Sequence, residues 1–220
     1  MSTAIEPQLL KFKEWTFRLR PTQIKPGRLL ILIHGWMGDE NSMWVLARRL
    51  PPNYAILSPR ATFPVVEGGF SWRKITPGTW GNSSIKELQP SAEALLAFVD
   101  NWSTSVTMDA RQFDLMGFSQ GAAMAYALVL LYPERVRRLA ALSGFIPEGG
   151  EALLAPQRLS QKPIFIAHGR QDEVISVEKA RRSTALLTEA GAQVTYCESD
   201  SGHKVSKECL REMELFLGEF

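Results

Sequence analysis

The chain has 220 residues, 45% of them hydrophobic and 22% charged, and its formal net charge is +2. These values are typical of a soluble globular protein with one domain over residues 1–220, and the scattered basic pairs, such as Arg48-Arg49, argue against a nucleic-acid partner. The N-terminal residues lack a basic start followed by an apolar run, and no apolar run could span a membrane. We therefore expect a cytoplasmic protein without a transmembrane segment.

Strand-like and helical patterns alternate along the chain. An alternating segment at 14–20 (EWTFRLR) predicts an antiparallel edge strand. Six runs predict strands at 28–35, 54–60, 113–119, 139–145, 163–169 and 193–199. Most of them are continuously apolar, as expected for strands buried on both faces of a parallel sheet. Helical patterns fall at 41–50, 91–102, 119–131, 177–190 and 205–217. This order predicts an α/β fold, with a mostly parallel central sheet and helices on both faces.

The segment Gly117-Phe118-Ser119-Gln120-Gly121 lies where an apolar strand ends and an alanine-rich helix begins. In that position G-x-S-x-G is typical of a nucleophile elbow, a strained turn that exposes the serine Oγ while the glycines let strand and helix approach closely. The alternative is a plain glycine-rich turn. Because ligands bind at the carboxyl ends of parallel strands, partners for Ser119 are expected in the loops that follow the other strands.

A serine nucleophile needs a base, and the sequence has three histidines, each in a loop at a strand end. His34 lies in a glycine-flanked loop that looks like an oxyanion element, and His168 is interpreted as a residue that shapes a turn. His203 follows the last predicted strand and is the candidate base. Its alternative is a surface histidine at the start of a helix.

The base needs an orienting carboxylate, and Asp172 follows the fifth buried strand. Glu173 is the alternative acid. Asp200 lies only three residues from His203 and is interpreted as a turn residue. With Asp172 the chain order is Ser119, Asp172, His203, which is the order expected of an α/β-hydrolase.

The tetrahedral intermediate also needs hydrogen-bond donors for its oxyanion. We expect one donor in the backbone N–H of Gln120, at a helix N-terminus, and the other in the loop after the first buried strand. Trp36 is the candidate there, with Met37 as the alternative.

Residues 61–90 are predicted to form an irregular segment, longer than a usual connection and rich in aromatic residues. We expect Phe70 and Trp72, together with Phe63, to form a wall of an apolar acyl pocket beside Ser119, with Trp36 opposite. The alternative is an aromatic cluster that pins the segment down. Trp80 belongs to the same aromatic set.

The two cysteines, Cys197 and Cys209, lack the spacing of a metal site. Without an export signal, we expect both to be buried or idle thiols rather than a disulfide, and no bound metal.

Four motifs together are similar to the phospholipase/carboxylesterase family, which includes acyl-protein thioesterases and small bacterial carboxylesterases. They are Leu32–Asp39, Gly117–Ala122, His168–Val174 and Gly202–Val205. The resemblance runs from about residue 28 to the C-terminus, and the segment 59–72 resembles the family's loop over the substrate. It implies a serine hydrolase without a cofactor and with a small or absent cap. Trp36 stands where the family commonly has a smaller aliphatic residue.

These observations predict cleavage of carboxylic esters with short to medium acyl chains through an acyl-enzyme on Ser119. The substrate is expected to be a small ester or thioester, a lipid or an acylated protein. An acyl-protein thioesterase or a lysophospholipase with the same triad is the first alternative. A non-catalytic binding protein with the α/β-hydrolase fold is the second.

Overall fold

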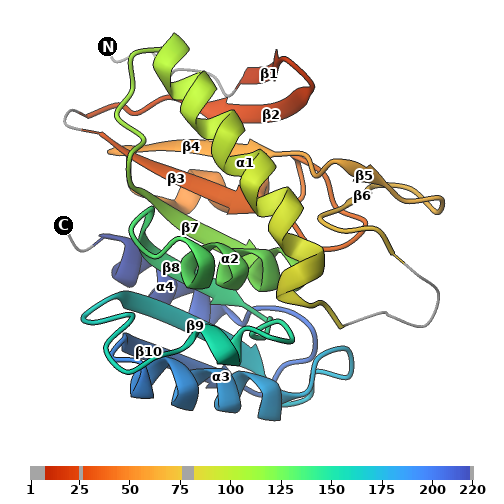
Figure 1. The fold of residues 1–220 in the computed structure, drawn as a ribbon, viewed down its shortest axis with the longest axis vertical. Coiled ribbons are helices and arrows are strands. Elements are labelled where there is room, and N and C mark those ends of the chain that lie inside the picture. Colours follow the sequence, from red (N-terminus) through yellow and green to blue (C-terminus); the bar gives the residue numbers. More distant parts are fainter. Residues whose placement is uncertain (1–7, 25–26, 76–81, 219–220) are drawn as a thin grey trace.

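Figure 1 shows the fold as a computed structural model, which describes residues 8–24, 27–75 and 82–218. Its centre is an eight-stranded sheet in the order β1-β2-β4-β3-β7-β8-β9-β10. The strands are β1 (Gln8–Phe12), β2 (Trp15–Arg20), β3 (Arg28–Ile33), β4 (Tyr54–Pro59), β7 (Phe113–Phe118), β8 (Val136–Leu142), β9 (Pro163–Gly169) and β10 (Gln193–Ser199). From β4 to β10 all neighbouring strands run parallel, while β2 is antiparallel to both β1 and β4.

Helices cover both faces of this sheet (Figure 1). Helices α1 (Ile85–Ser105), α2 (Gln120–Leu131) and α3 (Val177–Glu189) pack on one face, where their buried side chains belong to the same hydrophobic cluster as Ile31 of β3. The other face carries α4 (Lys207–Gly218) and the 3-10 helix η1 (Trp44–Arg49), whose buried side chains belong to a second hydrophobic cluster with Leu30 and Leu32. A second 3-10 helix, η2, spans Glu151–Leu153. Because both faces are covered, the central strands are apolar at successive positions, and the predicted α/β architecture is confirmed.

The predicted strand at 14–20 forms, but it is not at the edge. Strand β2 lies between β1 and β4, and β1 is the outer strand. Residues 8–12 form a hairpin with β2, whose turn places Lys13 at a φ of 52°. The short segment QLLKF has no clear alternation of its own, so its strand character comes from pairing with β2.

Helix α1 begins at Ile85, earlier than the expected start at residue 91. A capping box explains the difference: the Ser84 hydroxyl accepts the N–H of Glu87 (3.2 Å), and the Glu87 carboxylate accepts the N–H of Ser84 (2.8 Å). The segment expected to be irregular ended at Pro90, but this proline lies inside the helix.

Part of the segment predicted to be irregular is a small hairpin. Strands β5 (Phe63–Pro64) and β6 (Phe70–Ser71) pair antiparallel, and the Phe70 N–H donates to the carbonyl of Gly38 (2.9 Å) in the loop after β3. The hairpin is therefore fastened beside the end of the central strand β3. Trp80 lies outside the described residues.

Cys197 in β10 and Cys209 in the first turn of α4 form a disulfide, with their Cα atoms 5.6 Å apart. The expectation of two thiols was therefore wrong. The chain turns back between β10 and α4, which packs on the sheet beside β10, and this return brings the two cysteines together. Their spacing in the sequence carries no sign of that contact.

Within the described part of the chain, no helix combines the length and the apolar composition needed to cross a membrane.

Candidate active site

Ser119 stands at the turn from β7 to α2, with φ 55° and ψ −119°. The two glycines around it are required by close packing. A Cβ at Gly117 would collide with the carbonyl oxygen of Gly121, and a Cβ at Gly121 would collide with that of Ile33. The strand, the turn and the helix can approach this closely only without those side chains.

The three candidate triad residues lie together, in the loops after β7, β9 and β10. His203 Nδ1 lies 2.7 Å from Asp172 Oδ2, and His203 Nε2 lies 2.9 Å from Ser119 Oγ. The side chain of Asp172 is fully buried, whereas His203 is about one fifth exposed, at 21%. A proton on Nδ1 donated to Asp172 leaves Nε2 as the acceptor for the serine hydroxyl.

Backbone amides fix the carboxylate of Asp172. Its Oδ1 accepts the N–H groups of Val174 and Ile175, each at 2.9 Å, which leaves Oδ2 for His203. The alternative acid, Glu173, is exposed. Asp200 forms an ion pair with Arg170 (2.7 Å) instead of facing His203.

His34 is fully buried in the loop after β3. Its Nδ1 donates to the carbonyl of Gly35 (2.7 Å), and its Nε2 accepts the N–H of Ala61 (3.0 Å), so the ring links this loop to the end of β4. Burial lowers the pKa of His34 and so favours the neutral ring that these two bonds require.

The same loop lies against Ser119. A Cβ at Gly35 would lie 3.4 Å from the Cβ of Ser119, and Trp36 follows directly. Gln120 is the first residue of α2, where backbone N–H groups have no acceptor inside the helix. The candidate oxyanion donors thus flank Ser119 from two different loops.

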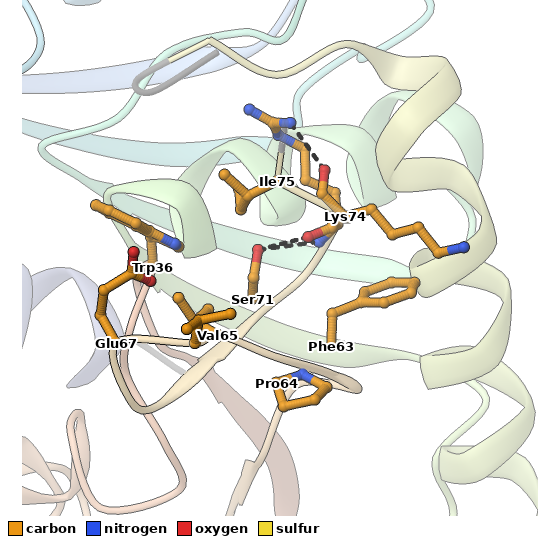
Figure 2. A pocket seen from close by; sticks show the side chains of 10 residues that line it. Trp36, Phe63, Pro64, Val65, Glu67, Ser71, Lys74 and Ile75 are labelled. Carbon is orange, nitrogen blue, oxygen red and sulfur yellow. Dashed lines mark hydrogen bonds between the residues drawn. The ribbon is translucent and has the colours of Figure 1, made fainter. Parts of the chain in front are cut away.

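Two cavities share part of their lining, and Ser119 lines the smaller of them. The smaller, of about 60 Å³, is lined by Ser119 and Gln120 together with Phe145 and Ile175. The larger is a groove of about 450 Å³ along the β5–β6 hairpin, drawn in Figure 2. The two share Trp36, Arg73 and Ile75, so the groove begins where the serine cavity ends.

A model of the phospholipase/carboxylesterase family matches residues 17–219. The chain belongs to this family.

The chain is 26% identical to acyl-protein thioesterase 1 of Debaryomyces hansenii, over 89% of the chain and 92% of that protein. It is 32% identical to the carboxylesterase SOBER1 of Arabidopsis thaliana, over 47% of the chain and 46% of that protein. A solved carboxylesterase from Mesorhizobium loti has the same fold, with a TM-score of 0.81 and 24% identity over 97% of this chain and 99% of that one. The expected family, the α/β-hydrolase fold and the ester-hydrolase class are thereby confirmed.

Three aromatic residues were expected to line an acyl pocket: Phe63, Phe70 and Trp72. Phe63 lines the groove (Figure 2), and Phe70 and Trp72 do not. Trp72 is fully buried, and its Nε1–H donates to the carbonyl of His34 (2.8 Å). Phe70 packs against the core and lies under the guanidinium of Arg60, 4.7 Å away. The interpretation of Phe70 and Trp72 as pocket walls is therefore corrected: they support the loops around Ser119.

Sequence reasoning missed three features of this site. Two of them are Val65 and Ile75, which line the groove. In the sequence they are apolar residues in a loop, and that pattern alone does not indicate a groove. The third is the side chain of Gln120, whose amide oxygen accepts the N–H of Trp72 (3.0 Å) and whose Nε2 donates to Ser71 Oγ (3.0 Å). These bonds tie β6 to the elbow, so the groove wall is fixed relative to Ser119.

Proposed function

We propose that the protein hydrolyses carboxylic esters with short to medium acyl chains through an acyl-enzyme on Ser119. The observation that carries this proposal is the unbroken series of contacts from Asp172 through His203 to Ser119 Oγ, beside a cavity that continues into a mostly apolar groove. Membership of the phospholipase/carboxylesterase family supports the choice of an ester substrate.

Acylation begins with attack of Ser119 Oγ on the carbonyl carbon while His203 Nε2 takes the hydroxyl proton. The negative oxygen of the tetrahedral intermediate lies between the backbone N–H groups of Trp36 and Gln120. His203 then gives its proton to the leaving oxygen, the C–O bond breaks and the alcohol departs. Asp172 stabilises the imidazolium that exists between these two proton transfers.

Deacylation repeats the sequence with water as the nucleophile. His203 takes a proton from water, the hydroxide oxygen adds to the acyl carbon, and the same two N–H groups bind the oxyanion. Collapse returns the proton from His203 to Ser119 Oγ and releases the carboxylic acid. No oxidant, reductant or further group is needed to balance either half.

The acyl chain is assigned to the groove. Phe63, Pro64, Val65 and Ile75 give it apolar walls, and each CH₂ buried there contributes up to about 0.8 kcal/mol. The groove joins the serine cavity beside Trp36, so the chain has to pass that indole to reach the groove.

A thioesterase activity is the second candidate, because the acyl-protein thioesterase of Debaryomyces hansenii matches over 89% of this chain. The triad chemistry is the same for a leaving thiol. An ester and a thioester with the same acyl chain separate the two activities: a kcat/KM at least ten times higher for the thioester would assign the thioesterase.

A fluorophosphonate probe and p-nitrophenyl esters test the proposal. The parental protein is expected to form a covalent adduct at Ser119 and to turn over the esters, and Ser119→Ala to do neither, with a loss of about 10⁴-fold or more. A folded parental protein that neither labels nor turns over any ester would instead be a binding protein. An alanine variant with near-parental turnover would show that another residue is the nucleophile.

The cytoplasmic location stays a prediction, and the disulfide between Cys197 and Cys209 argues against it, since disulfides persist mainly in oxidising compartments. Alkylation of thiols in intact cells, before lysis, measures the state of the pair. Free thiols would support a cytoplasmic location, and a protected disulfide would argue for an oxidising one.

A further inference from the structure

His168 has no part in the proton transfers described above, yet it lies directly beneath the acid. It is the penultimate residue of β9, and its side chain is fully buried. Its Nε2–H donates to the carbonyl of Ile175 (2.8 Å), seven residues further along the chain. This hydrogen bond links the end of β9 to the turn that contains Asp172.

Ile175 is thereby held at both of its backbone groups. Its carbonyl accepts from His168, and its N–H donates to Asp172 Oδ1 (2.9 Å). His168 Nε2 also lies 3.4 Å from Asp172 Oδ2, the oxygen that faces His203. That distance is long for a hydrogen bond, but it places the positive end of an N–H dipole beside a buried carboxylate.

The other ring nitrogen of His168 has no hydrogen-bond partner among the described residues, although it is buried. A buried polar atom without a partner destabilises the fold, and an apolar side chain of similar size would avoid that cost. The useful part of the ring at this position is therefore Nε2–H, which acts on the Asp172 turn.

We propose that His168 is a positioning residue for the triad: through Ile175 and its own Nε2–H it holds the carboxylate of Asp172 in line with His203. The inference rests on the proposed function, because it assigns to His168 an effect on the step that Asp172 and His203 perform. A displaced acid leaves His203 poorly oriented, which slows proton transfer but leaves the groove that binds the acyl chain unchanged.

A matched pair of variants tests this role. His168→Gln keeps an N–H donor at the distance of Nε2 from the backbone, and His168→Met has a similar length and no donor. We expect His168→Met to lower kcat for p-nitrophenyl butyrate by about 10–100-fold with KM within about twofold, and His168→Gln to stay within about threefold of the parental kcat. Equal losses in the two variants would overturn the proposal.

A double-mutant cycle distinguishes action through Asp172 from a general defect. In the Asp172→Asn background, His168→Met is expected to cost less than about twofold, because the group that it positions is already lost. A loss of the same factor in both backgrounds would overturn the proposal. If His168→Met fails to fold, His168→Asn takes its place in the comparison with His168→Gln. The side-chain amide of His168→Asn is one bond closer to the backbone than that of His168→Gln. Equal kcat values for His168→Asn and His168→Gln would likewise overturn the proposal.

Failure of the proposed function itself gives a different result. It would appear as ester turnover in Ser119→Ala, or as no labelling of the parental protein, before any variant at position 168 is compared.

Discussion

Ser119 occupies a backbone conformation that residues with a side chain rarely adopt, with φ 55° and ψ −119°. Such strain costs on the order of 1–3 kcal/mol and persists only where the surroundings enforce it. Here the N–H of Ser119 donates to the carbonyl of Leu142 in β8 (2.9 Å), and its carbonyl accepts the N–H of Ala122 in α2 (3.0 Å). The neighbouring strand and the helix together hold the serine where its Oγ meets His203.

A comparison of Ser119→Gly with Ser119→Ala measures this strain. Glycine adopts positive φ freely, whereas alanine retains the steric conflict, so the glycine variant is expected to be more stable by about 1 kcal/mol. Chemical denaturation of both variants, neither of which has the Ser119 hydroxyl, gives the difference directly. An alanine variant of equal or greater stability would mean that the turn stores no strain.

At the same scale, His203→Ala is expected to cost about as much turnover as Ser119→Ala, because the members of a triad act as a unit. Asp172→Asn keeps the shape of the acid but not its charge, and its expected loss is about 10²–10⁴-fold. Glu173→Gln is the matched control, since that neighbouring carboxylate is exposed. Steady-state kcat for one small ester checks the series, and a larger loss for Glu173→Gln than for Asp172→Asn would move the acid by one residue.

At the scale of elements, the connection from β10 to α4 carries His203 and is closed by the disulfide between Cys197 and Cys209. A cross-link over a segment of this length restricts the unfolded chain and contributes about 3 kcal/mol. The double substitution Cys197→Ser with Cys209→Ser is expected to lower the free energy of unfolding by about 2–4 kcal/mol. Denaturation with and without a reductant checks this: the reductant should destabilise the parental protein and leave the double variant unchanged.

The loop after β3 depends on a neutral His34. Burial holds its folded pKa below the ordinary value of 6.5, so the unfolded chain binds more protons as the pH falls below about 6.5. The stability that His34 contributes is therefore complete above that pH and is lost at lower pH, as the pH falls towards its depressed pKa. His34→Gln does not titrate, and its melting temperature is expected to fall less between pH 7 and pH 5 than that of the parental protein. Parallel curves would contradict this.

Much of this arrangement could be predicted from the sequence where one local signal was strong. The continuous apolar runs predicted the buried strands, and the elbow motif, with the histidine and aspartate after later strands, predicted which residues meet. The start of α1 was missed because the capping box at Ser84 and Glu87, which begins the helix, was not recognised in the sequence. Trp72 was misplaced because an aromatic residue in a loop looks the same whether it faces a substrate or, as here, donates to a buried carbonyl. The disulfide was missed because a contact between two separate elements leaves no local pattern in the sequence.

At the scale of the whole molecule, the parallel order of the strands brings the chemistry to one edge of the sheet. The loops after β3, β7, β9 and β10 carry Trp36, Ser119, Asp172 and His203, and Figure 1 shows these strands ending on the same side, where the β5–β6 hairpin also lies. The hairpin is bonded to the loop after β3 and, through Gln120, to the elbow. Under the proposed function, the sheet and hairpin therefore set the direction in which an acyl chain bound to Ser119 extends.

Under the proposed function, the volume of the groove predicts the preference for acyl chains. The value of kcat/KM is expected to rise from acetate to butyrate and hexanoate esters, since each CH₂ buried adds up to about 0.8 kcal/mol. It is expected to fall once the acyl chain is too large for the groove of about 450 Å³.

Val65→Trp would fill the groove and is expected to reduce kcat/KM for hexanoate by at least about tenfold more than for acetate. Val45→Trp adds the same indole at an exposed position on η1, 75% accessible and outside the groove, and is the matched control. A chain-length profile from p-nitrophenyl esters compares the three proteins. If Val65→Trp and Val45→Trp gave the same profile, the acyl chain would have to bind outside this groove.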